Sequence, residues 1–181
     1  MKKILGIDPG TTILGFAILD ANTPKGALIE MGTFRLSKIK EQADKLKAIF
    51  EKSLELLDFH QPQILAIEAP FYGKNPQSML KLGRAQGVVI AAAMYKGLEV
   101  FEYSPRKIKQ SITGNGNASK EQVAAMLQNM NWIKTTKHPL DATDALAVAV
   151  CHLMQNKITT GGEKFYGWES FILKNQERII S

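Results

Sequence analysis

Apolar residues change their spacing along the chain, from short strand-like runs at the beginning to helical spacing further on. Residues 3–8 form an apolar run that ends at Pro9-Gly10, and this dipeptide is a strong turn signal. Residues 13–19 and 27–34 follow as two further runs, separated by turn-forming residues. The three runs therefore predict an antiparallel meander of three strands.

Residues 40–59 have a different period, because their apolar side chains recur at helical spacing and charged residues fill the opposite face. They predict an amphipathic helix. Residues 64–67 then form a fourth apolar run, which ends in Glu68. The remaining elements are expected in this order: a helix at 76–95, a strand at 98–103, a loop-rich basic section, a helix at 119–129 with a capping box at Ser119, and a helix at 139–154.

Together these elements predict an α/β fold, in which a mixed five-stranded sheet is flanked by helices. The chain has 181 residues, of which 45% are hydrophobic, and this is enough for one buried core and too little for two. The small residues Ala142, Ala145 and Ala149 would let the last helix approach the sheet closely. Residues 157–181 lack a clear periodicity and are expected to form a C-terminal tail of unknown role.

Charge favours a polyanionic partner, because 23 lysines and arginines outnumber 17 aspartates and glutamates. Nucleic acid is the first candidate, although many basic soluble proteins bind none. Cys151 is the only cysteine, which excludes an intrachain disulfide and fits a reducing cytoplasm. The N-terminal apolar run is too short for a signal peptide, and the longest apolar stretch, 88–95, falls short of the roughly 20 residues that span a membrane. We therefore expect a cytoplasmic protein with no membrane partner.

Two carboxylates stand at the ends of predicted strands. Asp8 ends the first strand, and the turn that follows leaves its side chain beyond the sheet. Glu68 follows the fourth strand, and a carboxylate buried there needs a cation, a proton or water. Each residue also has a plain structural explanation, since Asp before Pro-Gly is a common turn residue and Glu68 could be exposed at the strand end.

Asp141 and Asp144 lie three residues apart, so on a helix their carboxylates share one face and repel each other without a cation. Asp141 alone is explained as a first-turn acid that complements the positive end of the helix. Asp144 lies beyond the first turn and precedes an apolar stretch. If this helix packs across the carboxyl ends of the first and fourth strands, its two acids meet Asp8 and Glu68.

Four converging carboxylates are stabilised by divalent metal, and their oxygen ligands suit Mg²⁺, with Mn²⁺ as a substitute. Two such ions about 4 Å apart activate a water and stabilise the departing oxygen in an in-line displacement at phosphorus. The acids therefore indicate a phosphodiester hydrolase with two metal ions in its active site.

Four ordered motifs resemble those of one known family: ILGIDPG at 4–10, AIE at 66–68, LKLGRAQG at 80–87 and DATDALA at 141–147. Through them, residues 1–156 resemble the RuvC family of bacterial Holliday junction resolvases. The resemblance implies a ribonuclease H-like nuclease domain over these residues and symmetric cutting of four-way junction DNA during recombination and repair. It also implies a homodimer and a partner complex that contains a branch-migration helicase. The metal ligands and catalytic residues that it implies are Asp8, Glu68, Asp141 and Asp144.

Two lysines near the acids are candidates for contact with DNA. Lys109 follows a basic stretch, and Lys120 follows a Gly-Asn loop whose backbone N–H groups could also meet a phosphate. From the sequence alone, a solvated basic surface is the slightly better explanation. The resemblance, however, matches Lys109 and Lys120 to the family's DNA-contacting lysines.

Phe71 and His138 are less certain from sequence, because each has an ordinary explanation. Phe71 follows Glu68 by three residues and either stacks on an unpaired base or packs over the next helix. His138 is a candidate for proton transfer, although a histidine at a helix start is more often incidental.

A symmetric cut requires two copies of the chain, because a compact domain of this size carries one set of acids. The helix at 76–95 is the candidate interface, since it offers more apolar surface than the sheet alone needs. The residues expected to form this interface are Met79, Leu82, Val89 and Met94.

Three other functions share parts of this pattern. A related ribonuclease H-like nuclease acting on structured RNA would keep the strand acids and the basic surface, although the motif at 80–87 favours a junction resolvase. An actin-like sugar kinase or ATPase has a comparable hairpin around residues 8–12, but it needs a second domain for which this chain is too short. A catalytically dead DNA-binding module would be expected to lack some of the acids, and all four are present.

Overall fold

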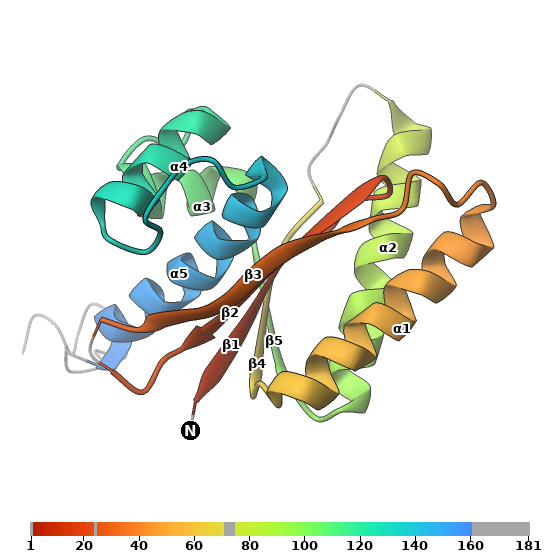
Figure 1. Ribbon diagram of the computed structural model, residues 1–181, viewed down its shortest axis with the longest axis horizontal. Helices are drawn as coiled ribbons and strands as arrows, with labels where there is room; N and C mark the ends of the chain where they lie inside the picture. The colour runs from red at the N-terminus through yellow and green to blue at the C-terminus, as the bar shows by residue number, and fades with distance from the viewer. Residues whose placement is uncertain (1, 24, 71–74, 161–181) are drawn as a thin grey trace, which may run out of the picture.

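Five strands form one mixed sheet, ordered β3-β2-β1-β4-β5 (Figure 1), in the computed structural model, which describes residues 2–23, 25–70 and 75–160. β1, β2 and β3 pair in antiparallel fashion, which confirms the predicted meander. β4 joins β1 in parallel, and β5 joins β4 in parallel, so the carboxyl ends of these three strands lie at the same edge. The strands are β1 (Lys3–Asp8), β2 (Ile13–Asp20), β3 (Ala27–Arg35), β4 (Ile64–Glu68) and β5 (Glu99–Tyr103).

Helices cover both faces of the sheet, and this confirms the predicted α/β architecture (Figure 1). Side chains of each strand alternate between two apolar cores. Leu5 and Ile7 of β1 pack in the core beneath the first pair of helices, whereas Ile4 packs in the core beneath the other three. The helices of the first face are α1 (Gln42–His60) and α2 (Pro76–Tyr95), and those of the second are α3 (Pro105–Thr113), α4 (Lys120–Asn129) and α5 (Leu140–Thr160).

The α5 backbone lies directly on the sheet because glycines of β1 and β2 leave room for it. A Cβ atom added to Gly15 would lie 1.9 Å from the carbonyl oxygen of Asp141, and one added to Gly6 would lie 2.3 Å from that of Ala145. Ala145 and Ala149 are fully buried, in agreement with the close approach expected from the small residues of this helix. Two glycines therefore set the height of Asp141 above the strand that ends in Asp8.

One element and the end of one helix differ from the sequence prediction. The section interpreted as loop-rich contains the helix α3, whose N-cap Ser104 accepts a hydrogen bond from the Lys107 amide and whose first residue is Pro105. Serine followed by proline is a helix-start signal, so the start of α3 is encoded locally in the sequence. α5 continues to Thr160, so the first four residues of the predicted tail belong to the helix. The capping box at Ser119 is confirmed.

One of the α2 residues expected at a subunit interface lies in the core instead. Val89 is 1% exposed and packs beneath the helix, so its assignment to a surface between two copies was wrong. Met94, by contrast, is 65% exposed, and Leu80 offers a further exposed apolar side chain on this helix. None of the described helices is long and apolar enough to cross a membrane.

Candidate metal centre

The strand acids meet because their strands are parallel neighbours. Asp8 is the last residue of β1 and Glu68 the last residue of β4, and each directly follows one member of the Ile7–Ile67 pair in the parallel register. Both side chains are half-buried at the edge of the sheet. The predicted strand-end position of both acids is therefore confirmed.

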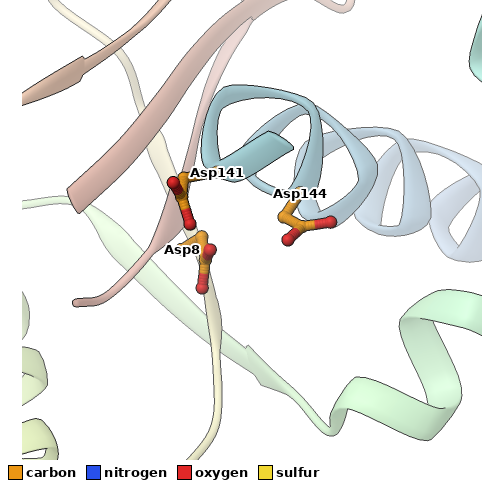
Figure 2. Close-up of side chains that lie close together, drawn as sticks. All are labelled: Asp8, Asp141 and Asp144. Atoms are coloured by element: carbon orange, nitrogen blue, oxygen red, sulfur yellow. The ribbon is translucent and has the colours of Figure 1, made fainter. Parts of the chain in front are cut away.

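The first turns of α5 bring two more carboxylates to the end of β1. One carboxylate oxygen from each of Asp8, Asp141 and Asp144 can be selected so that all three atoms lie within 4.8 Å of one another. Figure 2 shows this acid cluster, in which Asp8 lies next to Asp141, and Asp144 projects from the same helix as Asp141. Glu68 stands outside the cluster, but its charge acts on Asp8.

Burial and mutual repulsion make the ionised acids unfavourable. Burial, together with the charges of Glu68 and Asp144, raises the pKa of Asp8 from 3.8 to about 8. Burial and the charge of Asp144 raise the pKa of Glu68 from 4.5 to about 7. Burial also raises the pKa of Asp144, although a nearby lysine opposes this shift. Strongly perturbed carboxyls that lie close together are typical of a functional site.

Lys120 is the lysine that opposes the repulsion. Its ammonium group forms a direct ion pair with Oδ2 of Asp144 and lies 3.7 Å from Oδ1 of Asp141. Burial alone would lower the pKa of Lys120, but these contacts outweigh it and raise that pKa. Lys120 is the first residue of α4, where the Ser119 capping box fixes the start of the helix.

A cavity of about 500 Å³ opens beside the acids and is lined from several helices. Glu68 and Asp144 line it together with Lys109 and Lys120, so acidic and basic side chains share this cavity. Arg106 also lines it, as a cavity residue that sequence reasoning treated only as part of a basic stretch. Its place follows from α3, because the helix turns Arg106 and Lys109 toward one side, so the Ser104-Pro105 start signal could have identified it.

The Gly-Asn loop before α4 uses its backbone donors within the protein. Asn115 N–H donates to Thr113 Oγ1, Asn117 N–H to Asn115 Oδ1, and Ser119 N–H to Gln122 Oε1. These three N–H groups are therefore already satisfied, and the residue of this loop that lines the cavity is Gly116.

The sequence also suggested Phe71 and His138 as site residues. Phe71 lies outside the residues that the structure describes. His138 precedes α5 by two residues and is not among the side chains that line the cavity.

The acid cluster fits a divalent cation by its donor set and spacing. Carboxylate oxygens are the ligands that Mg²⁺ prefers, and its short metal–oxygen distances suit donors gathered this closely. The raised pKa values of Asp8 and Glu68 also indicate that a bound cation would stabilise the ionised form of these partly buried carboxyls. The residues present therefore fit the metal that the sequence implies.

The shifted pKa values predict how metal and pH act on stability. Because Asp8 keeps its proton in the fold up to about pH 8 but loses it near 3.8 when unfolded, metal-free protein should lose stability as pH rises through this window. Mg²⁺ binds the deprotonated acids, so its stabilising effect should grow over the same window. Thermal unfolding across this pH range, in EDTA and in Mg²⁺, should give curves that diverge as pH rises. Parallel curves, or divergence that persists unchanged in Asp8→Asn, would contradict the prediction.

Sequence comparison relates nearly the whole described fold to one group of enzymes. The family model described as crossover junction endodeoxyribonuclease RuvC matches residues 4–152. A curated protein of that name from Christiangramia forsetii is 53% identical over 178 residues, which cover 98% of this chain and 93% of the relative. Another from Bacteroides fragilis is 50% identical over 180 residues, with 98% and 96% covered.

Solved structures give the same relation. The chain is similar to Thermus thermophilus RuvC in complex with Holliday junction substrate, with a TM-score of 0.80, 30% identity, and coverage of 88% of this chain and 98% of the other. The yeast mitochondrial Holliday junction resolvase matches with a TM-score of 0.68 at 13% identity, over 88% of this chain and 81% of the other, and this likeness concerns the fold alone.

Proposed function

Because the chain belongs to the RuvC family of crossover junction endodeoxyribonucleases, we propose that it resolves Holliday junctions by symmetric, metal-dependent hydrolysis of phosphodiester bonds in DNA recombination and repair. One observation carries the proposal: three acids with ligand atoms within 4.8 Å of one another lie beside a cavity that basic side chains also line. Hydrolysis of a polyanion at a metal site uses carboxylates that hold the cations and positively charged side chains that hold the phosphates.

The proposed metal is Mg²⁺, with Mn²⁺ as a substitute and two ions in each active site. When bound, such ions stabilise charge on the scissile phosphate and activate a water for in-line attack. The residues proposed to hold them are Asp8, Glu68, Asp141 and Asp144. Glu68 stands outside the acid cluster, but it lines the cavity with Lys109, whose charge acts on it, and this suits a ligand on the substrate side of the site.

The proposed DNA contacts are Lys109, Lys120 and Phe71. Lys109 lines the cavity, and its charge acts on both Glu68 and Asp144, so a phosphate bound there would lie close to the acids. Phe71 is proposed to stack on a base freed at the junction centre, where base pairs open at a lower cost than in intact duplex.

Two copies of the chain are proposed to act on one junction, because paired cuts require two active sites. The exposed residues Met94 and Leu80 support α2 as the surface that joins them. Sedimentation of the protein with and without junction DNA tests this assembly. We also propose a cytoplasmic location and, from the family, association with a branch-migration helicase complex.

A direct assay tests the proposed function against its alternative, a related nuclease acting on structured RNA. Purified protein in Mg²⁺ should cut a four-way junction in two opposite strands and leave a duplex of the same sequence intact. An RNA–DNA hybrid and a structured RNA serve as competing substrates. Preferential cutting of either RNA substrate would favour the alternative, and cutting in EDTA would exclude the metal-dependent mechanism.

Lys109→Ala should weaken junction binding and lower its dependence on salt. Each phosphate contact that is lost should reduce the slope of log affinity against log salt by about one unit. Lys109 is half-buried at the cavity and belongs to neither apolar core, so the thermal unfolding of the variant should stay near wild type. Lys47→Ala is a matched control, since Lys47 lies on the exposed face of α1. An unchanged slope for Lys109→Ala would make this lysine part of a solvated basic surface.

A further inference from the structure

Lys120 has two possible partners, the acid cluster and a DNA phosphate in the cavity, and it cannot serve both at once. Its ammonium group is paired with Asp144 and lies close to Asp141, inside the group of acids that suits a divalent ion. Yet its side chain is also 48% exposed and lines the cavity proposed to receive DNA. The same ammonium therefore pairs with the acids in this structure, whereas the proposed function requires it at a DNA phosphate.

The charges around the acid cluster explain why the ammonium lies there. Gathering the ionised carboxylates of Asp8, Asp141 and Asp144 within 4.8 Å is unfavourable, and a cation stabilises them, since like charges at this distance in a partly buried site repel strongly. Lys120 supplies that cation from α4, a different helix from the one that carries Asp141 and Asp144. The ion pair thus also joins α4 to α5 at the edge of the site.

A divalent ion and the ammonium cannot use Asp144 in the same way. An ion bound to this carboxylate would lie about 2 Å from its oxygen, and the ammonium lies within hydrogen-bonding distance of the same group. Two cations held this close repel each other, and each draws on the negative charge of one carboxylate. Occupation of Asp144 by one of them therefore weakens the other.

We propose that Lys120 is the counter-cation of the acid cluster in the metal-free protein, and that a divalent ion displaces it and so frees it for a DNA phosphate. This inference rests on the proposed metal-dependent cutting of junctions and deepens it. Metal binding then prepares the site in two ways, because it supplies the catalytic ions and releases a DNA contact. By linkage, DNA that captures the freed lysine also strengthens metal binding.

The first test measures Mn²⁺ binding by calorimetry without DNA, in wild type, Lys120→Met and Lys109→Met. Lys109→Met is the matched control, because Lys109 lines the same cavity, whereas within the described residues it makes no ion pair with the acid cluster. Removing the competitor should tighten Mn²⁺ binding by roughly fivefold or more. Removing only a nearby, screened charge should change it by about twofold or less. Equal changes in both variants would overturn the proposal.

The second test follows Lys120 itself in wild-type protein, so that it does not depend on the folding of a variant. In protein labelled at lysine Cε and Nζ, the Lys120 resonances should shift when Ca²⁺ is added without DNA, and those of Lys109 should shift much less. Resonances of Lys120 that stay in place while Ca²⁺ binds would mean that the lysine remains on Asp144, and the proposal would fail.

The third test asks when the phosphate contact is made. In EDTA, wild type and Lys120→Met should bind the junction with the same salt dependence, because Lys120 is held by Asp144. In Ca²⁺, the slope for Lys120→Met should be about one unit smaller than that of wild type. An equal difference under both conditions would contradict displacement. The metal and resonance measurements need no DNA, so a protein that cuts no junction could pass them, which separates failure of this inference from failure of the proposed function.

Discussion

Asp144→Asn should abolish the cutting of a four-way junction in Mg²⁺ while leaving junction binding in Ca²⁺ close to wild type. Asp144 contributes to the acid cluster and lines the cavity, so its loss removes a proposed metal ligand next to the bound phosphate. Metal ions contribute several kcal/mol to the transition state, and about 1.4 kcal/mol corresponds to a tenfold change in rate. We therefore expect the rate to fall by about a thousandfold or more.

Binding should survive this change because the proposed phosphate contacts are separate from the carboxylate. Asparagine is nearly the same size as aspartate, and Lys120 would lose its main ion-pair partner and become available to DNA. Asp58→Asn is a matched control, since Asp58 is exposed and pairs with Lys96 on the surface, where an ion pair contributes little to stability. Near-normal cutting by Asp144→Asn in Mg²⁺ would remove Asp144 from the metal site, and a loss of cutting by Asp58→Asn would indicate a general defect.

The strands and the acids of this protein could be predicted from sequence because their signals are local. The change from short apolar runs to helical spacing identified the sheet and the helices around it, and the Pro9-Gly10 turn identified the end of β1. Asp8 and Glu68 then stood at strand ends by their place in the chain alone. Their convergence with Asp141 and Asp144 required one further assumption, that α5 crosses the ends of β1 and β4, and the family motifs supplied the support for it.

The ion pair of Lys120 could not be predicted, because it depends on how two helices meet. Lys120 and Asp144 are 24 positions apart in the chain, and no periodicity links the start of α4 to the second turn of α5. Val89 was misassigned for a related reason. The spacing of apolar residues on α2 does not reveal which of its faces packs on the sheet, and burial of Val89 became visible only with the partner strands in place.

No sequence signal linked the glycines of β1 and β2 to the acids. Substitution of one of them nevertheless has the second large effect that we expect. Gly15→Ala should strongly destabilise the protein and disrupt the metal site. The added Cβ would lie 1.9 Å from the carbonyl oxygen of Asp141, and this contact is with backbone, which cannot rotate away as a side chain can. Overpacking of this kind costs about 1–3 kcal/mol and sometimes more. To relieve it, the first turn of α5 must move away from β2 and take Asp141 with it.

Such a movement should reduce catalysis in the molecules that still fold. A displacement of about 1 Å at reacting groups lowers rates by roughly a hundredfold, and Asp141 and Asp144 would both shift relative to Asp8, which remains on the sheet. Thermal unfolding, Mn²⁺ calorimetry and junction cutting measure the effect together. Gly87→Ala is the matched control for folding, because a Cβ there meets no atom within 4 Å and alanine is the better helix former on α2. Its melting temperature should equal or exceed that of wild type. If Gly15→Ala also melts and binds Mn²⁺ as wild type does, α5 does not depend on this glycine for its position, and the spacing of the acid cluster must be set by other contacts between the helix and the sheet.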